Sequence, residues 1–337
     1  MSRMSAWTER RRRWRKRLRR HAAWRRSRLL LRDGFLLSFW GLCALLPPAG
    51  ASRLGAACSR VLGRLSSKND KIRQNLRIVF PNAPESELRR IKRAVWSNMG
   101  AVIGEYPHLG GLGWSVDGGA GLVSAVPPHL LANFKGERLT VFVAGHLANW
   151  EVLAVVPALW GVDLAVVYTP IGEGVADRRL RAYREGMSIR LLPRDGSARE
   201  LLRHLKGGHP VGIVADHRAD EGVSLPFFGH TKRTTLSPAR LALRMGADLV
   251  AVRVERLGPA RFRVSAEGPI RPPAGVAGEA AEARAMMTAF NVCLERWIRE
   301  RPGEWLCSKR AFPKETAEAR LPLPGSPPHR ADLSQHA

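Results

Sequence analysis

One strand and the helix that follows it are encoded by Val141-Phe-Val-Ala-Gly145-His146-Leu-Ala-Asn149-Trp150-Glu151-Val-Leu153. The apolar run at residues 139–143 has the composition of a buried β-strand, and a glycine ends it. An apolar helical pattern then starts at Glu151 and predicts a helix over residues 151–159. Strand, turn and helix in this order form the unit from which parallel α/β sheets are assembled.

The same alternation continues along the chain. Further strands are expected at residues 163–168, 189–192, 210–214, 248–253 and 261–265. Helices are expected at residues 68–79, 84–105, 198–205, 236–245 and 280–300, with a basic helix around residues 178–184. We therefore expect an α/β fold with a mainly parallel central sheet flanked by helices.

His146 and Glu151 are candidates for acid–base chemistry. A neutral imidazole can accept a proton from a hydroxyl when a carboxylate holds its other ring nitrogen as the donor. Glu151, in the first turn of the expected helix, can reach back across the turn, and the helix N-terminus favours its ionised form. Asp216 follows another expected strand, so His146 and Asp216 both lie beyond the carboxyl ends of strands, where ligands gather in such sheets.

An ordered set of motifs extends well beyond the segment that contains His146 and Glu151. Its members are Asn75-Leu76 with Phe80-Pro81, Trp96-Ser-Asn98-Met99-Gly100 with Glu105-Tyr106, Gly145-His146-Leu-Ala-Asn-Trp-Glu151, Asp216-His217 and Pro226-Phe227-Phe228-Gly229. In order and spacing the set resembles the bacterial lipid A biosynthesis acyltransferases of the lauroyl and myristoyl type, over residues 30–312. The resemblance implies a glycerol-3-phosphate acyltransferase-like fold with an N-terminal membrane-anchoring helix.

The resemblance also implies a reaction. His146 would remove the proton from a hydroxyl of a lipid A precursor, and Glu151 would hold the imidazole and stabilise its protonated form. The implied donor is an acyl-carrier-protein thioester, which suits a basic enzyme because that carrier is strongly acidic, while coenzyme A thioesters stay open. We expect direct transfer without a cofactor or metal, since no G-x-S-x-G elbow and no C-x2-C spacing is present.

Other residues of the set have two possible roles each. Arg184 and Arg194 match arginines near the family's cleft, where they would bind phosphate or an oxyanion, or they belong to a solvated basic face. Asp216 and His217 would shape the cleft and bind the acceptor, or make structural hydrogen bonds. Glu105, with the tyrosine after it, is open between a structural and a substrate-side role.

A pair of aromatic residues and a pair of basic residues complete the candidate site. Phe227 and Phe228, expected in a loop, would pack in the core or form a wall of the acyl-chain pocket. Lys232 and Arg233 follow closely and would meet a lipid phosphate or the acidic carrier protein.

The N-terminus is strongly basic. Lys and Arg exceed Asp and Glu by 26 over the 337 residues, and residues 1–33 alone hold 14 basic residues against two acidic ones. Such a block suits a nucleic-acid arm, a solvated tail or a membrane anchor. The uncharged run at residues 34–46 favours an anchor on an anionic membrane surface, because it is apolar but short for a full crossing.

These observations predict four segments. They are a basic cytoplasmic segment (1–33), a membrane-anchoring apolar helix and connector (34–66), an acyltransferase domain (67–312) and a disordered tail (313–337). The positive-inside bias predicts a location on the cytoplasmic face of a bacterial inner membrane. Two rival functions remain, an acyltransferase acting on another membrane lipid such as a glycolipid or lysophospholipid, and an anchored nucleic-acid-binding protein; no nucleic-acid partner is expected.

Overall fold

The computed structural model describes residues 27, 29–110, 121–170, 174–187, 189–193, 198–313 and 316. The basic segment expected at residues 1–33 lies almost wholly outside these ranges. Arg194 and nearly all of the expected tail also lie outside the described residues.

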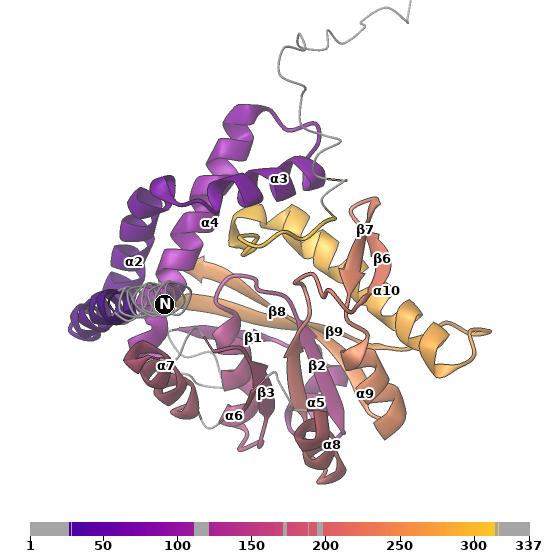
Figure 1. The fold of residues 1–337 in the computed structure, drawn as a ribbon. Helices are drawn as coiled ribbons and strands as arrows, with labels where there is room; N and C mark the ends of the chain where they lie inside the picture. The colour runs from indigo at the N-terminus through magenta and orange to yellow at the C-terminus, as the bar shows by residue number, and fades with distance from the viewer. Residues whose placement is uncertain are drawn as a thin grey trace, which may run out of the picture.

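A seven-stranded sheet in the order β1-β9-β8-β2-β5-β3-β4 forms the centre of the molecule (Figure 1). Its strands are β1 (Leu122–Ala125), β2 (Thr140–Ala144), β3 (Ala165–Tyr168), β4 (Arg190–Pro193), β5 (Val211–Val214), β8 (Asp248–Gly258) and β9 (Arg261–Ile270). Neighbouring strands run parallel except β8 and β9, which form an antiparallel pair. The expected α/β fold with a mainly parallel sheet is therefore confirmed.

Helices and short 3₁₀ turns connect and cover the strands. The helices are α2 (Pro48–Leu62), α3 (Asn69–Val79), α4 (Glu85–Glu105), α5 (Leu131–Phe134), α6 (Val155–Leu159), α7 (Val175–Glu185), α8 (Ala198–Lys206), α9 (Ser237–Met245) and α10 (Glu279–Glu300). The 3₁₀ turns are η1 (Gly63–Leu65), η2 (Tyr106–His108), η3 (Pro128–Leu130), η4 (Trp150–Ala154) and η5 (Pro302–Glu304).

The single helix expected at residues 151–159 is divided into η4 and α6. Pro157 lies within this segment, and a proline has no backbone N–H to donate to the carbonyl four residues earlier. The first turn, which contains Glu151, is therefore wound more tightly than an α-helix.

β2 contributes to two cores, because alternate residues of a strand point to opposite faces of its sheet. Val141 and Val143 pack in the core that α9 and α10 complete, whereas Phe142 and Ala144 pack in the core that η4 and α6 complete. All five residues of β2 are buried. The residues that follow β2 therefore start from a strand held on both faces.

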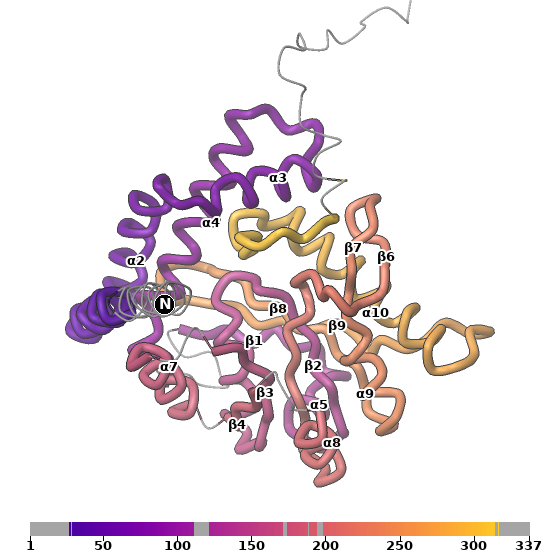
Figure 2. The backbone as a smooth tube through the Cα atoms, in the orientation of Figure 1, coloured from indigo at the N-terminus to yellow at the C-terminus, as the bar shows by residue number. Residues whose placement is uncertain are grey.

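α2 and α4 lie side by side at one end of the molecule (Figure 2). Two glycines permit this contact, since a Cβ atom on Gly55 would lie 2.1 Å from the carbonyl oxygen of Gly100. Any side chain at Gly55 would force the two helices apart.

A helix whose described part covers residues 29–44 precedes α2. Trp40 and Cys43 are buried against the body of the protein, while several large apolar side chains are exposed: Leu30, Leu31, Phe35, Leu42 and Leu45. Within the described ranges, every helix is too short or too polar to cross a bilayer. A helix thus forms where the anchor was expected, and its membrane-anchoring role stays a prediction.

The segment around Phe227 and Phe228 is not a loop. Strands β6 (Val223–Phe227) and β7 (His230–Thr234) pair as an antiparallel hairpin of their own. Phe228 and Gly229 form its two-residue turn with φ angles of 51° and 72°. Positive φ at both central positions is the geometry that matches the twist of paired strands. The usual Asn-Gly signal is absent here, and the expectation of a loop was wrong for this reason.

Candidate active site

The sheet brings His146 and Asp216 together. β2 and β5 are adjacent and parallel, and their register places Ala144 opposite Val214. His146 lies two positions after Ala144, and Asp216 lies two positions after Val214. The two side chains therefore follow the ends of neighbouring strands. The alternation of strands and helices in the sequence could not reveal that these two strands are neighbours.

His146 is held by Asp216. The Nδ1 atom of His146 lies 2.6 Å from Oδ1 of Asp216, and the indole N–H of Trp305 donates to Oδ2 of Asp216 at 3.2 Å. Burial opposes ionisation of Asp216, but the neighbouring imidazole outweighs it and holds the pKa of the carboxyl well below its usual range. Asp216 therefore acts as an ionised acceptor that fixes the ring, and Nε2 of His146 is left to accept a proton.

The expectation that Glu151 orients His146 is wrong. Both oxygens of Glu151 are occupied by other donors. Arg184 donates through Nε to Oε2 at 2.8 Å and through Nη2 to Oε1 at 2.5 Å, and the Tyr106 hydroxyl donates to Oε1 at 2.8 Å. The tight first turn directs Glu151 toward α4 and α7 instead of back toward the ring.

The pair of Glu151 and Arg184 is a buried bidentate ion pair. The two side chains are 7 % and 13 % exposed. Burial opposes the charge on Arg184, but the carboxylate of Glu151 outweighs it and raises the pKa of the guanidinium above its ordinary value. Two-point contact fixes the direction of a guanidinium as well as its distance. Glu151 thus positions Arg184 at the wall of the site.

Three hydrogen bonds from other segments hold the loop that carries His146. Ala148 adopts a φ of 47°, a conformation that non-glycine residues rarely take without outside support. Its N–H donates to the carbonyl of Glu304 at 3.0 Å, and the side chain of Asn98 donates to its carbonyl at 3.0 Å. The N–H of Leu306 also donates to the carbonyl of His146 at 2.9 Å. These contacts hold the ring in place before any substrate binds.

A buried network under this loop answers the question about Glu105. Its side chain is fully buried, accepts from Asn149 at 2.9 Å and from Ser52 at 2.6 Å, and is paired with Arg256. Arg256 in turn donates to Asn98 at 3.0 Å. Glu105 is therefore structural, because no part of it is open to a substrate.

A cavity of about 1680 Å³ opens beside His146 and is called the catalytic cavity below. Arg184, Glu151 and His217 also line it. Much of the remaining wall is apolar: Phe142, Leu153, Leu164, Val166, Ile189, Leu191, Ile213 and Leu241. Charged and polar residues line other parts of the wall, among them Arg218, Asp220, Arg240 and Lys309. The apolar part of such a cavity can hold an alkyl chain while polar groups meet its reactive head.

His217 stacks on the catalytic ring. The two imidazole centroids are 4.1 Å apart with an angle of 20° between the planes. Burial lowers the pKa of His217 to about 4, although Asp216 opposes the shift, so this ring is neutral at physiological pH. Its Nε2 atom is buried and has no hydrogen-bond partner in the part of the chain that the structure describes. Stacking on a neutral ring restricts the rotation of His146 without adding a charge.

His146, Asp216 and His217 could be considered as metal ligands, since their donor atoms lie within 4.8 Å of one another. Both oxygens of Asp216 already accept hydrogen bonds, and one of the two histidines is a donor in that arrangement. The geometry fits a hydrogen-bonded acid–base pair better than a metal centre.

Four other expected site residues do not reach the catalytic cavity. Phe227 is fully buried, packs on Phe312 and belongs to the core, and neither it nor Phe228 lines the cavity. Lys232 is also fully buried, donates to the carbonyl oxygen of Asp216 at 3.2 Å and lies 4.0 Å from the ring centroid of Phe227. The expectation that Lys232 meets a lipid phosphate or a carrier protein was therefore wrong. Arg233 is exposed on β7, away from the cavity.

Burial lowers the pKa of Lys232 to about 8, although the charges of Asp216 and Glu295 oppose the shift. Its contact with the backbone of Asp216 places a cation directly behind the residue that holds His146. Lys232 thus supports the site from inside the protein. Arg194 lies outside the described residues.

The relatives found by comparison with known proteins are acyltransferases. Phosphatidylinositol mannoside acyltransferase of Mycolicibacterium smegmatis is 27 % identical over 227 residues, which covers 63 % of this chain and 71 % of that protein. A protein of the same name from Mycobacterium tuberculosis is 28 % identical over 131 residues, covering 36 % of this chain and 40 % of that protein.

The profile of the bacterial lipid A biosynthesis acyltransferases matches residues 24–314, nearly the whole chain. This range contains every residue of the site described above. The resemblance noted from the sequence motifs is therefore confirmed. The chain belongs to the bacterial lipid A biosynthesis acyltransferase family and is an acyltransferase.

Proposed function

We propose that this protein transfers a fatty acyl chain from a thioester to a hydroxyl group of a membrane glycolipid. The pair of His146 and Asp216 at the wall of the catalytic cavity carries the proposal, because it supplies a base at the end of a space suited to an alkyl chain. The mycobacterial relatives support a glycolipid acceptor, since both are named as acyltransferases of phosphatidylinositol mannosides.

The proposed reaction proceeds in a ternary complex. Nε2 of His146 takes the proton of the acceptor hydroxyl as its oxygen attacks the thioester carbonyl, and Asp216 stabilises the imidazolium that forms. The new C–O bond forms, the C–S bond breaks, and the proton passes from the imidazolium to the departing thiolate. The products are an ester and a free thiol, with no covalent enzyme intermediate.

Arg184 has a distinct part in this proposal. Its guanidinium lines the catalytic cavity and is fixed by Glu151, so it presents a preorganised positive charge without having to be ordered on binding. Such a group can stabilise the oxyanion of the tetrahedral intermediate or the phosphate of an anionic acceptor. We assign it the first role.

A lipid A precursor is the second candidate acceptor, and the family profile over residues 24–314 favours it. Acyl-carrier protein is the proposed donor because the net charge of +26 would attract that acidic carrier. Coenzyme A thioesters remain the alternative donor.

We further propose attachment to an anionic membrane surface at the cytoplasmic face of a bacterial inner membrane. The exposed apolar side chains of the helix at residues 29–44 support this, since Leu30 and Leu31 are 64 % and 75 % exposed. An interfacial helix of this kind lies in the membrane plane and does not cross it.

The test is a two-by-two assay with the purified full-length protein. Palmitoyl thioesters of acyl-carrier protein and of coenzyme A are each combined with a phosphatidylinositol mannoside and with a tetra-acylated lipid A precursor, and products are identified by mass spectrometry. We expect an added acyl chain on the mannoside, abolished by His146→Ala. Acylation of the lipid A precursor alone would replace the glycolipid proposal by the second candidate. Thioester hydrolysis without any acylated lipid would contradict both.

A further inference from the structure

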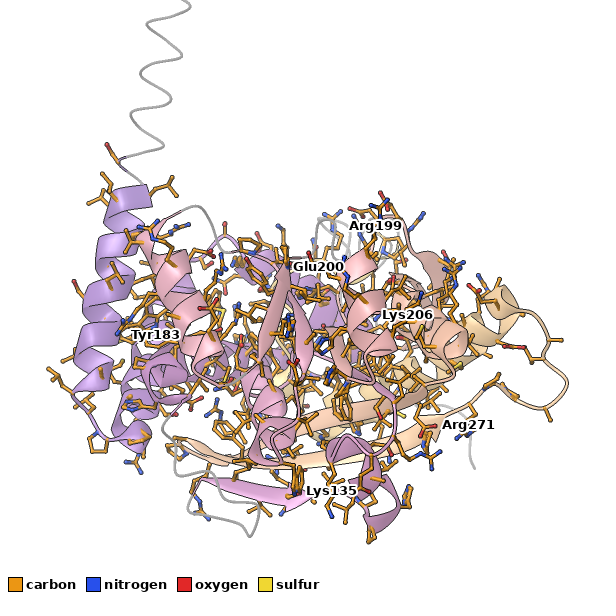
Figure 3. The ribbon with its side chains drawn as sticks, turned by 90° about the horizontal axis from the view of Figure 1, so that it is seen from below. Lys135, Tyr183, Arg199, Glu200, Lys206 and Arg271 are labelled. Carbon is orange, nitrogen blue, oxygen red and sulfur yellow. The ribbon has the colours of Figure 1, made fainter. Side chains whose placement is uncertain are left out.

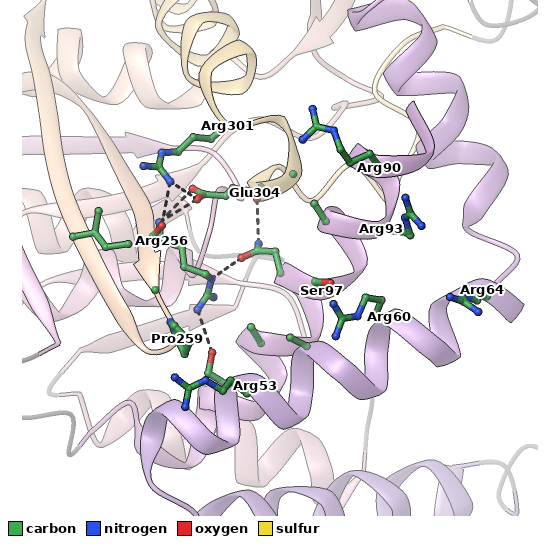
Figure 4. A pocket seen from close by; sticks show the side chains of 18 residues that line it. Arg53, Arg60, Arg64, Arg90, Arg93, Ser97, Arg256, Pro259, Arg301 and Glu304 are labelled. Atoms are coloured by element: carbon green, nitrogen blue, oxygen red, sulfur yellow. Dashed lines mark hydrogen bonds and ion pairs between the residues drawn. The ribbon is translucent and has the colours of Figure 1, made fainter. Parts of the chain in front are cut away.

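A second hollow lies on the other side of α4 from the catalytic cavity. It has a volume of about 810 Å³ and is lined by α2, η1, α4, η5 and the turn between β8 and β9 (Figure 4). Five arginines reach it from the two helices and the 3₁₀ turn: Arg53, Arg60, Arg64, Arg90 and Arg93. We call this hollow the arginine pocket.

The helix periodicity makes this cluster. Arg53, Arg60 and Arg64 are 7 and 4 residues apart, and Arg90 and Arg93 are 3 apart, so each set occupies one face of its helix. α2 and α4 then bring the two faces together. Figure 4 shows Arg60 and Arg64 on one side of the pocket and Arg90 and Arg93 on the other.

Most of these positive charges are not neutralised. Within the described ranges, the guanidinium groups of Arg53, Arg60, Arg64 and Arg93 have no ion-pair or hydrogen-bond partner, and Arg90 contacts Glu87 at 3.1 Å. The pocket is lined by a single carboxylate, Glu304.

That carboxylate is already occupied. Glu304 accepts from Arg301 at 3.1 Å and from the backbone N–H of Arg256 at 3.3 Å. It therefore cannot neutralise the arginines of the two helices. Guanidinium groups that gather without anions around a hollow are disposed to bind phosphate, whose oxygens match their paired N–H groups.

Three exposed apolar side chains neighbour these arginines in the chain, although they are not among the residues that line the pocket. Val61, Leu62 and Leu65 are 61 %, 54 % and 89 % exposed, and they alternate along the chain with Arg60 and Arg64. Exposed leucines beside unpaired arginines suit a bilayer surface, where the apolar side chains enter the acyl layer and the cations meet phosphates. A free phosphate ion would make no use of these three side chains.

The acyl-carrier protein is a poorer fit. No residue lines both the arginine pocket and the catalytic cavity. α4 divides them, with Asn98 facing the pocket and Met99 facing the cavity. A carrier docked on the pocket would have to pass its acyl chain around α4 to reach His146.

We propose that the arginine pocket binds the phosphodiester headgroup of an anionic glycerophospholipid, with Val61, Leu62 and Leu65 inserted beside it. The site lies outside the catalytic cavity and goes beyond the proposed acyl transfer. It would hold the protein on anionic membrane and fix its orientation there.

The test compares two triple variants of the full-length protein that lose the same charge. The pocket variant is Arg60→Gln/Arg64→Gln/Arg93→Gln. The control is Arg199→Gln/Arg203→Gln/Lys206→Gln on the exposed face of α8, where Figure 3 shows Arg199 and Lys206. Both keep the basic segment at residues 1–33, so any difference between them reports the position of the lost charges.

Binding is measured by co-sedimentation with vesicles of phosphatidylglycerol and phosphatidylcholine, and with vesicles of phosphatidylcholine alone. We expect the pocket variant to bind the anionic vesicles about tenfold more weakly than the wild type and the control to stay within about twofold. Equal losses in both variants would show attraction by net charge alone and overturn the proposal. So would unchanged binding by the pocket variant.

Two further measurements separate the possible ligands. In calorimetry, soluble dihexanoyl-phosphatidylglycerol should bind the wild type and the control but not the pocket variant, and inorganic phosphate at the same concentration should not compete. Competition by inorganic phosphate would assign the pocket to free anions. Acyl transfer to detergent-dispersed acceptor should be unchanged in the pocket variant; a raised KM for acyl-carrier thioester, with normal vesicle binding, would assign the pocket to the carrier instead.

Discussion

The two hollows of this acyltransferase use arginine in opposite ways. In the catalytic cavity, Arg184 is 13 % exposed and both oxygens of Glu151 hold it. In the arginine pocket, Arg60 and Arg93 are exposed and have no carboxylate partner among the described residues. A buried charge must be paired, because desolvation costs several kcal/mol per ion. Arg184 is thus held in a fixed position by its carboxylate partner, whereas the unpaired arginines of the arginine pocket are available to a ligand.

The largest expected effect comes from removing the base in the catalytic cavity. His146→Ala leaves no group within reach to take the proton of the acceptor hydroxyl, so kcat should fall by about 10⁴-fold. The initial rate of acylated-lipid formation measures this, with the melting temperature as a check that the variant is folded. A variant that keeps a tenth of the activity would show that His146 is not the base.

The second prediction decides which acid holds His146. Asp216→Asn removes the charge that fixes the ring and should lower kcat by about 10³-fold, with the acid limb of the pH–rate profile moved to lower pH. Glu151→Gln leaves that hydrogen bond intact, so its profile should keep the wild-type shape even if the rate falls. The reverse pattern in the two pH profiles would restore Glu151 as the orienter.

The third prediction contrasts the two arginine environments directly. Arg184→Gln leaves a buried carboxylate without its main partner and should lower the free energy of unfolding by about 3–5 kcal/mol. Arg93→Gln, in the exposed pocket, should change it by less than about 0.5 kcal/mol. Urea unfolding measures both.

A double variant sharpens that contrast. Arg184→Gln with Glu151→Gln removes both charges and should recover much of the lost stability. If the double variant is as unstable as the sum of the two single ones, then the loss comes from packing and not from the unpaired carboxylate.

The sequence predicted where helices and strands begin and end better than it predicted which strands lie next to each other in the sheet. The helix expected at residues 84–105 matches α4, and the run at residues 139–143 matches β2 almost residue for residue. His146 and Asp216 were both placed at strand ends from the chain alone. Their pairing was missed, because β5 lies next to β2 in the sheet although β3 and β4 come between them in the chain.

The errors at the site have the same origin. Glu151 is five residues from His146, but its partners Tyr106 and Arg184 are 45 and 33 residues away from it. Lys232 was expected at the surface because the segment before it was expected to be a loop. Trp305 had no expected role, since a side chain that supports an acid 89 residues away leaves no local pattern.

The fourth prediction concerns pH and the histidine that stacks on the base. The pKa of His217 falls from its ordinary value of 6.5 to about 4 on folding, so between these values the unfolded chain binds a proton that the folded protein does not. Stability should therefore decrease as the pH falls from 6.5 toward 4, by about 3 kcal/mol at most. Urea unfolding across this pH range should show that the free energy of unfolding declines less steeply in His217→Gln than in the wild type. If the stability of the variant and of the wild type fell in parallel with pH, then His217 would not be the cause of the decline.

The smallest expected effect is that of Tyr106→Phe. Burial, followed by the charge of Glu151, raises the pKa of this hydroxyl above its ordinary value, so it remains a donor at every pH used for assay. The variant removes one hydrogen bond to a carboxylate whose two oxygens stay bound to Arg184. The loss of stability should be about 1.5 kcal/mol, at most half of that from Arg184→Gln. An equal loss in the two variants would mean that the tyrosine hydrogen bond contributes as much as the guanidinium to holding Glu151, and the contrast between the paired arginine and those of the arginine pocket would then be weaker.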